Sequence, residues 1–362
     1  MVYSIVDDNM KKIYIDGYFL AQRITGVQRY AEELVKNINN KGYDIIILAP
    51  KNIKRTIPGV VIKRSKMFSG LLWQQFILPI QLFFLGKPII TSLSGLGPIL
   101  YPNKLLAIHD ASLYRYPSYF SNLYRIVYKK LYPITIFFSK AIITVSEFSK
   151  QEIKELINIS KDILVVNNVT PQSYEGSLRD NIYEQMEPYI LVVGTLDKRK
   201  NLKNVLEAFQ QSKLKGVYKL LVAGGTAKSF SDNEWITNLC SDDVIFLGYV
   251  SDAELANLYN RAHFFIYMSI YEGFGIPPLE SLANNCPVLL SDIDVFKEIY
   301  GDSFEYANPL SVESIAMGLE RVVSSDRHEL YEKQRIALSK YTKENQVKQF
   351  EEIIKRYIHA AY

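Results

Sequence analysis

The sequence predicts an α/β protein made of two successive halves, each with a sheet whose strands are separated by helices. Three observations support this prediction. Short apolar runs alternate with helix-like segments along almost the whole chain. The length, 362 residues, is enough for two domains of ordinary size. A polar stretch without apolar periodicity, residues 170–187, interrupts the alternation and is interpreted as an interdomain linker.

The apolar runs place the strands of the first half. We expect them, in chain order, at residues 12–16, 43–48, 88–92, 105–108, 141–145 and 164–168. After the first strand, Thr25 or Gly26 caps an amphipathic helix. A glycine turn before a helix can receive a phosphate, although a single glycine also suits an ordinary helix start. His109 ends another strand, where it would face a ligand crevice; a histidine packed in the core is the alternative.

The second half repeats the alternation. Its strands are expected at residues 189–194, 218–225, 244–250, 264–267 and 288–290, and its last segment, 342–360, has helical apolar spacing. Lys198, Arg199 and Lys200 follow the first of these strands, which ends in Gly194, and precede a helix. Cations in that place can clamp phosphates, whereas a solvated basic turn is the alternative interpretation.

The most informative stretch of the second half is the loop after residues 264–267. Gly273 and Gly275 let its backbone approach a ligand closely, and a helix that starts at the following prolines directs its positive end there. Glu272 and Glu280 frame the loop, and carboxylates accept hydrogen bonds from sugar hydroxyls. A nucleotide sugar fits this combination. A solvated loop glutamate and a glutamate that stabilises a helix start are the alternatives.

The string E-G-F-G-I-P-P-L-E-S-L-A at residues 272–283 resembles the E-x7-E signature of retaining glycosyltransferases of family 4, which have the two-domain GT-B fold. Three other strings resemble the same family: T-G-V-Q-R-Y at 25–30, W-Q-Q-F-I-L-P at 73–79, and H-D at 109–110. The turn at 194–201 departs from the family pattern, because Thr195 stands where an arginine is usual.

This resemblance implies two Rossmann-like domains that face a cleft. Residues 1–172 would bind the acceptor, residues 173–341 would bind the nucleotide sugar, and residues 342–362 would form a helix that crosses back to the first domain. It also implies roles: Glu280 would hold the ribose, Glu272 the donor sugar, and His109 the donor sugar or acceptor at the reacting centre. Lys200, with Arg199 as substitute for the missing arginine, would stabilise the leaving diphosphate. Donor contacts are also expected at Gly26, Gly194, Thr195, Val250, Gly273, Phe274, Gly275 and Ile276.

The implied activity is retaining transfer of a hexose from a nucleotide-diphosphate sugar to a lipid-linked oligosaccharide of bacterial surface polysaccharide, O-antigen or capsule. The spelling of residues 194–201 favours mannose, hence GDP-mannose, with rhamnose or another hexose and dTDP- or UDP-hexose donors left open. No metal or cofactor is expected, and the D-x-D string at 292–294 is interpreted as a loop. The alternatives are an epimerase or glycogen-synthase-like polymerase of this fold, or a non-catalytic glycan-binding subunit.

Charge and composition suggest where the protein acts. Residues 51–140 hold 13 Lys and Arg but one acidic residue, Asp110, so an anionic partner is expected. Basic residues at 51–66 precede Phe68, Leu71, Leu72 and Trp73, and tyrosines alternate with cations at 124–132, as in interfacial segments. The two cysteines lack metal spacing, and neither a signal peptide nor a spanning helix is expected. These features predict a cytoplasmic protein on the anionic inner face of the membrane, and no nucleic-acid motif accompanies them.

Overall fold

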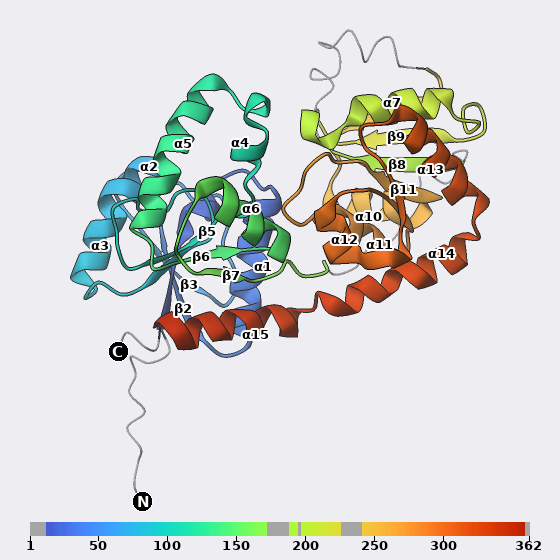
Figure 1. Cartoon of the computed structure of the whole chain (residues 1–362). Helices are drawn as coiled ribbons and strands as arrows, with labels where there is room; N and C mark the ends of the chain where they lie inside the picture. The colour runs from blue at the N-terminus through green and yellow to red at the C-terminus, as the bar shows by residue number, and fades with distance from the viewer. Residues whose placement is uncertain (1–11, 172–187, 195–196, 226–240, 359–362) are drawn as a thin grey trace, which may run out of the picture. The chain divides into compact units, whose positions relative to one another are not determined.

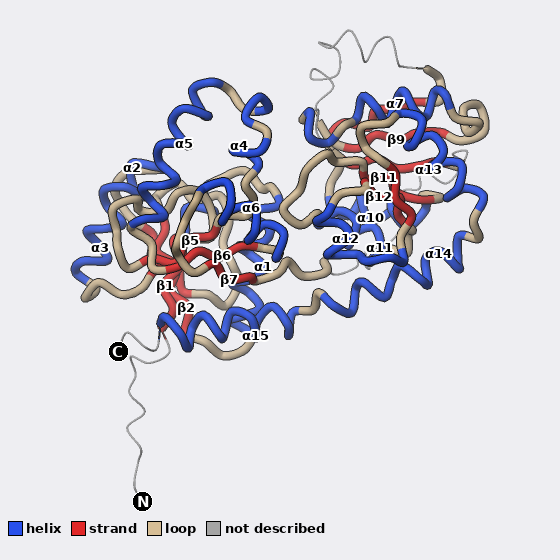
Figure 2. The backbone as a smooth tube through the Cα atoms, viewed as in Figure 1, coloured by secondary structure: helices blue, strands red, loops and turns tan. Residues whose placement is uncertain are grey.

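Each of the two units of the chain is built around a parallel β-sheet (Figures 1 and 2). A computed structural model describes residues 12–171, 188–194, 197–225 and 241–358. The first unit comprises Met1–Val169 with Thr342–Tyr362, and the second comprises Thr170–Tyr341. The expected α/β class with two parallel-sheet units is confirmed. Most of the expected linker, residues 172–187, lies outside the described residues.

The sheet of the first unit has the strand order β3-β2-β1-β4-β5-β6-β7, with every described neighbour pair parallel. Its strands are β1 (Lys12–Asp16), β2 (Asp44–Ala49), β3 (Val61–Arg64), β4 (Ile90–Ser92), β5 (Lys104–Ala107), β6 (Ala141–Thr144) and β7 (Ile163–Val165). The strands β5 and β6 are buried throughout, as parallel strands covered on both faces should be. The sequence does not predict β3, because this edge strand is mostly exposed and carries only two apolar residues.

Helices cover the first sheet, and the end of the chain returns to it. The helices are α1 (Gly26–Asn40), α2 (Gly70–Leu72), α3 (Leu78–Phe84), α4 (Ser112–Arg115), α5 (Asn122–Phe137), α6 (Glu147–Ile157) and α15 (Lys343–Ile353), with helical turns at Gly17–Ala21, Trp73–Ile77, Pro117–Tyr119 and Ile354–Ile358. The C-terminal helix α15 lies along α1 (Figure 1), where Asn37 donates to Gln346 over 3.0 Å. Tyr43, just before β2, donates to Glu351 of α15 over 3.1 Å. The expected return of the C-terminal helix to the first domain is therefore confirmed.

The sheet of the second unit has the order β10-β9-β8-β11-β12-β13 and is also parallel. Its strands are β8 (Tyr189–Val193), β9 (Lys219–Ala223), β10 (Val244–Gly248), β11 (Phe264–Tyr267), β12 (Val288–Ser291) and β13 (Glu305–Ala307). Its helices are α7 (Leu202–Gln211), α10 (Asp252–Arg261), α11 (Ile276–Ala283), α12 (Asp294–Tyr300), α13 (Val312–Ser324) and α14 (Arg327–Gln334), with helical turns at Lys198–Lys200, Gly301–Ser303 and Arg335–Lys340. The edge strand β13 is too short to be predicted from its sequence.

The strand order identifies one preferred ligand position in each sheet. The first strand of each sheet lies between two strands that the chain reaches in opposite directions: β1 between β2 and β4, and β8 between β9 and β11. Ligands of open parallel sheets bind outside the carboxyl ends of the strands at such a reversal. Candidate ligand contacts are therefore the residues that follow β1, β4 and β5 in the first unit, and β8 and β11 in the second.

Candidate active site

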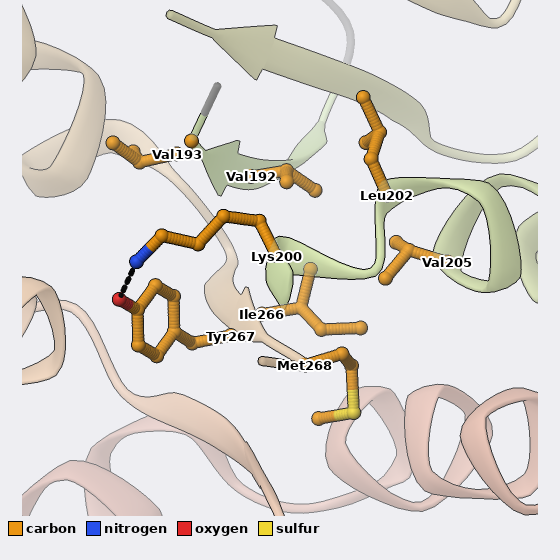
Figure 3. A pocket seen from close by; sticks show the side chains of 9 residues that line it. Val192, Val193, Lys200, Leu202, Val205, Ile266, Tyr267 and Met268 are labelled. Atoms are coloured by element: carbon orange, nitrogen blue, oxygen red, sulfur yellow. Dashed lines mark hydrogen bonds between the residues drawn. The ribbon is translucent and has the colours of Figure 1, made fainter. Parts of the chain in front are cut away.

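A charged cluster lies at the carboxyl ends of β8 and β11 (Figure 3). Lys200 extends along Gly194, at which an added Cβ would lie 3.5 Å from the Cβ and Cγ of the lysine. Its Nζ donates to Tyr267 OH over 2.6 Å and to Glu272 Oε1 over 2.6 Å. Tyr267 OH also donates to Glu272 Oε1, over 2.9 Å. Two strand ends and the loop after β11 thus meet in one hydrogen-bonded group.

Burial and opposite charge set the protonation of this cluster. The side chains of Lys200 and Glu272 are 24% and 16% exposed. Burial disfavours both charged forms, but their mutual attraction outweighs it, so the pKa of Lys200 is raised and that of Glu272 is lowered. Burial and the Glu272 charge raise the pKa of Tyr267. At neutral pH the cluster is therefore an ammonium, a neutral phenol and a carboxylate. Among the described residues, two of the three ammonium N–H groups have a partner, so the third can serve a ligand.

The glycine loop leads from this cluster into α11. Gly275 caps the helix with φ of 90°, and an added Cβ would lie 2.6 Å from Phe296 Cε1, so no other residue fits there. Its carbonyl accepts a hydrogen bond from Tyr300 OH over 2.5 Å. Phe274 is buried with its ring edge-on to Tyr341 at 5.0 Å, so it supports the loop from inside. Glu280 lies one turn into α11 and is half-buried.

Other predicted residues of the second unit have more local surroundings. The guanidinium of Arg199 donates to Asp197 Oδ2 from Nε and Nη2 over 3.0 and 2.6 Å. Lys200, not Arg199, is therefore the cation paired with Glu272. Val250 lies between the end of β10 and α10 and is half-buried. Thr195 lies outside the described residues.

In the first unit, residues far apart in the sequence line one cavity of about 360 Å³. Thr25 and Gln28 come from the start of α1, His109 and Asp110 follow β5, and Tyr128 comes from α5. The Thr25 backbone N–H and hydroxyl donate to Gln28 Oε1 over 3.1 and 2.5 Å, which fixes the helix start. Gly26 is the first residue of this helix. The structure thus brings together the two parts of the first half that the sequence singles out, at the predicted end of the sheet.

His109 is held in one orientation at the wall of this cavity. Its Nε2 is 3.1 Å from the Leu93 carbonyl, which can only accept, so Nε2 carries the proton. The Tyr30 ring packs edge-on against the imidazole at 4.9 Å. Burial lowers the pKa of His109, more than the Leu93 bond and the nearby Asp110 raise it. The neutral ring therefore offers Nδ1 as an acceptor.

The sequence did not single out Tyr267, which the structure places in the hydrogen-bonded group with Lys200 and Glu272. Tyr267 is the last residue of an apolar run, which by itself predicts only a buried strand. Its position at the carboxyl end of a parallel strand is the signal that could have marked it as a site residue.

Gln74 and Gln75 of the W-Q-Q string have structural roles. Gln74 donates to buried Asp16 over 2.6 Å, and Gln75 forms hydrogen bonds with the backbone of Gly97 and Ile99. In the described ranges no group of three or more His, Cys, Asp or Glu could hold a metal.

Comparison with known proteins identifies the family. The sequence model of the glycosyl transferases group 1 family matches residues 177–345. The O-antigen chain mannosyltransferase RfbU of Salmonella typhimurium is 31% identical over 264 residues, which cover 70% of this chain and 72% of that protein. The O-antigen chain mannosyltransferase B of Escherichia coli is 30% identical, over 64% of this chain and 65% of that protein.

The fold comparison agrees. The sucrose-phosphate synthase of Thermosynechococcus elongatus superposes with a TM-score of 0.77 at 16% identity, covering 97% of this chain and 99% of its own. The two parallel-sheet units, with the last helix returned to the first, are those of the GT-B fold. With the E-x7-E string placed on the glycine loop and α11, the conclusion is that this chain is a glycosyltransferase and belongs to the glycosyl transferases group 1 family.

Proposed function

We propose that this protein is a retaining transferase that moves a hexose, mannose first, from a nucleotide-diphosphate sugar to a lipid-linked oligosaccharide of a bacterial surface polysaccharide. The observation that carries this proposal is the Lys200–Tyr267–Glu272 cluster beside the Gly275 loop at the strand reversal of the second sheet. It provides a fixed cation for a diphosphate and a carboxylate for sugar hydroxyls. The two O-antigen mannosyltransferase relatives support mannose and O-antigen synthesis.

The geometry supports a role for Glu272 in binding rather than in nucleophilic attack. Its Oε1 accepts from both Lys200 and Tyr267, and its lowered pKa keeps it ionised and paired. We therefore propose front-face substitution, in which the leaving phosphate helps to deprotonate the acceptor and no enzymic nucleophile is needed. The third N–H of Lys200 and the loop N–H groups would stabilise the departing diphosphate, and Glu280 would hold the ribose.

A donor panel tests the activity directly. Purified protein is incubated with each of GDP-mannose, dTDP-rhamnose and UDP-glucose, with and without a polyprenyl-diphosphate-linked acceptor. The masses of the products are measured by mass spectrometry. We expect transfer from GDP-mannose and slow hydrolysis without acceptor. A free epimerised nucleotide sugar would support the epimerase alternative, and a growing homopolymer would support the polymerase. Absence of both transfer and hydrolysis with all three donors would refute the enzyme proposal.

We also propose that transfer needs no metal. Asp292, the first residue of the D-x-D string, pairs with Lys297 over 2.5 Å, while Asp294 starts α12, so the string lies in a helix start. Lys200 provides charge that a metal would otherwise provide. Activity is expected to be unchanged within twofold, roughly, after dialysis against EDTA and in assays that contain it. Loss of activity that Mg²⁺ or Mn²⁺ restores would contradict this.

Glu280→Ala is expected to weaken nucleotide binding. A carboxylate that accepts two ribose hydroxyls contributes on the order of 1.5–3 kcal/mol, so Kd for GDP should rise by about ten- to a hundredfold. Isothermal titration calorimetry measures this. Glu313→Ala removes an exposed helix glutamate of the same unit and should leave Kd unchanged. Equal affinities of both variants and the wild type would remove Glu280 from the donor site.

We propose further that the first unit docks on an anionic membrane. Six apolar side chains on the segment α2 to α3 are exposed, here called the apolar ridge: Leu71, Leu72, Phe76, Ile80, Phe83 and Phe84. Phe84 is 81% exposed. Exposed cations precede the ridge at Lys51, Lys54, Lys63, Arg64 and Lys66. Apolar side chains beside cations suit the interface of an anionic bilayer. None of the described helices is long and apolar enough to cross a membrane.

Two residues of the predicted membrane-binding region, Trp73 and Arg55, have structural roles instead. Trp73 is completely buried and packs in the core, so it cannot reach a bilayer. Arg55 is paired with Glu32 over 2.6 Å and donates to the carbonyls of Gln22 and Phe19, so it is a structural residue. The spacing of the ridge explains the error: both sides of this helical segment are apolar, and periodicity alone does not say which side is covered.

Vesicle co-sedimentation tests the docking proposal. The wild type should bind phosphatidylglycerol-containing vesicles at low salt, and much less at high salt or to neutral vesicles. Phe76→Ser/Phe83→Ser/Phe84→Ser should lose binding by about tenfold or more, because each phenylalanine contributes burial. Leu310→Ser, at a 70% exposed position of the second unit, is the matched control. Equal binding of the ridge variant and this control would refute the ridge as the docking surface.

A further inference from the structure

The first turn of α11 has few hydrogen-bond donors for a ligand. It consists of Ile276, Pro277 and Pro278. The first N–H groups of a helix have no partner inside the helix, so they are the groups that can bind an anion. Proline has no N–H, which leaves Ile276 as the residue of these three that provides one. Anion binding at this helix start therefore depends on the direction of a single peptide N–H.

The carbonyl of Gly275 sets the direction of the Ile276 N–H. Both groups belong to one peptide unit, and in a trans peptide they point in opposite directions. The described residues contain no cis peptide bond. The Gly275 carbonyl accepts a hydrogen bond from Tyr300 OH over 2.5 Å, and this bond is buried. Because the carbonyl is held toward the buried phenol, the Ile276 N–H is turned away from it, out of the helix start.

This peptide unit needs an anchor outside the loop. A glycine can adopt many backbone conformations, and Gly275, with φ of 90° and ψ of 78°, does not by itself fix the plane that follows it. Tyr300 is a rigid anchor: it is 3% exposed, and its ring packs against Phe296 at 5.8 Å and Phe304 at 5.1 Å. Burial raises the pKa of Tyr300 well above its usual value, so the hydroxyl remains a donor.

We infer that Tyr300 is a positioning residue for donor binding, whose hydroxyl orients the Gly275–Ile276 peptide so that the Ile276 N–H donates to the β-phosphate of a nucleoside diphosphate. The hydrogen bond also polarises this peptide, since linked hydrogen bonds strengthen one another. Tyr300 acts through Gly275 and is too buried to reach the ligand itself. The inference rests on the proposed function, which makes the ligand a nucleotide sugar.

Tyr300→Phe removes the hydroxyl and keeps the ring. Isothermal titration calorimetry on the full chain gives Kd for GDP and GMP, UDP and UMP, and dTDP and dTMP, and each pair differs by the β-phosphate. For the base that the wild type binds, the variant should weaken the diphosphate by about three- to tenfold and the monophosphate by less than about twofold. A distorted site would weaken both alike, so the ratio within a pair separates positioning from a general structural loss.

The sequence allows this peptide to be observed directly. Gly275-Ile276 is the one Gly-Ile pair in the chain. Cell-free synthesis with ¹³C at the glycine carbonyl and ¹⁵N in isoleucine therefore gives a single carbonyl-correlated amide signal, that of Ile276. In the wild type the diphosphate should move this signal much more than the monophosphate does, because it adds a hydrogen bond to phosphate. In Tyr300→Phe the diphosphate should move it less.

Tyr189→Phe is the matched control. Tyr189 is also 3% exposed, and its hydroxyl donates to the Leu258 carbonyl over 2.8 Å. It is the first residue of β8, so it lies at the amino edge of the sheet, whereas the glycine loop follows β11 at the carboxyl edge. This variant should lose similar stability and keep all affinities.

The outcomes separate the inference from the proposed function. Equal ratios of diphosphate to monophosphate affinity in Tyr300→Phe and the wild type would overturn the inference and leave the proposed function intact. A wild type that binds none of the three diphosphates would overturn both. If Tyr300→Phe does not fold, the wild-type Ile276 signal decides, because equal movement with diphosphate and monophosphate would overturn the inference.

Discussion

Lys200→Met is expected to lower kcat by about 10²- to 10³-fold, the usual effect of removing one donor that stabilises a developing anion. The lysine is fixed by Tyr267 and Glu272, and its pKa is raised, so it stays charged through the reaction. A methionine keeps the length of the side chain but offers no N–H to the departing diphosphate. Steady-state kinetics with GDP-mannose and acceptor measure the loss. Lys198→Met is the matched control, since this exposed lysine shares the same turn and lies outside the cluster.

The same substitution should also destabilise the second unit. Removing one member of a buried ion pair costs about 3–5 kcal/mol, and the partial exposure of this pair places it near the lower end. The cost comes from the buried Glu272 charge that is left unpaired. The double variant Lys200→Met/Glu272→Gln should therefore recover much of the stability while remaining inactive. Urea unfolding of the two single variants and the double variant gives the coupling free energy.

The two pKa shifts fix how the stability contributed by the Lys200–Glu272 pair depends on pH. The pKa of Glu272 is lowered in the folded state, so the stability from the pair is present above its ordinary value of 4.5 and disappears as pH falls through the lowered value. The pKa of Lys200 is raised above 10.5, so the alkaline limit lies above that value. The stability difference between the wild type and the double variant should therefore persist from above pH 4.5 to 10.5, decrease as pH falls through the lowered pKa of Glu272, and decrease again in alkali above 10.5. For the kcat prediction, wild-type kcat in Lys200→Met, or an equal loss of kcat in Lys198→Met, would contradict the catalytic role of Lys200.

Much of this architecture could be predicted because its signals are local. Buried parallel strands appear as short apolar runs, and the glycines and prolines after residue 272 mark a loop and a helix start. Topology then explains why His109 and the start of α1 share a cavity. The helix α1 follows β1, at the reversal of the first sheet, and His109 follows β5 at the same carboxyl edge of that sheet. The edge strand β3 escaped prediction because its solvent-exposed side needs no apolar residues.

The pairing of side chains could not be predicted from the sequence. Lys200 and Glu272 are both singled out by the sequence, but 72 positions separate them, and nothing local says that they bond. Arg199 shows the opposite situation, a pairing between near neighbours: its guanidinium donates to Asp197, two residues earlier. The orientation of Trp73 was wrong for a related reason: a helix with two apolar sides has no amphipathic signal that selects the buried one. Contacts between distant strand ends require the fold.

The second large effect is expected at Gly275→Ala, which should destabilise the second unit and impair donor binding. The residue has φ of 90°, a conformation that costs an alanine about 1–2 kcal/mol. The added Cβ would also lie 2.6 Å from Phe296 Cε1. Phe296 is fully buried, so relieving this overlap should cost a further 1–3 kcal/mol, roughly, as overpacking does. We therefore expect about 3 kcal/mol lost from the free energy of unfolding, measured in urea.

Gly216→Ala separates the two causes. Gly216 has φ of 77°, but an added Cβ there would meet nothing within 4 Å, so this variant carries the conformational cost alone. It should lose about 1–2 kcal/mol and retain wild-type donor kinetics. Equal costs in the two variants would mean that Phe296 moves aside freely.

The expected effect of Gly275→Ala on donor binding follows from what the displaced ring touches. The Phe296 ring packs against Tyr267 at 5.7 Å, and Tyr267 holds both Lys200 and Glu272. A ring pushed from its place would shift Tyr267, so Gly275→Ala should raise Kd for GDP even where the protein remains folded. Adding Phe296→Leu, which shortens the obstructing side chain, should restore part of both stability and affinity. If that second change restores neither, the loop conformation at Gly275, and not its contact with Phe296, controls the site.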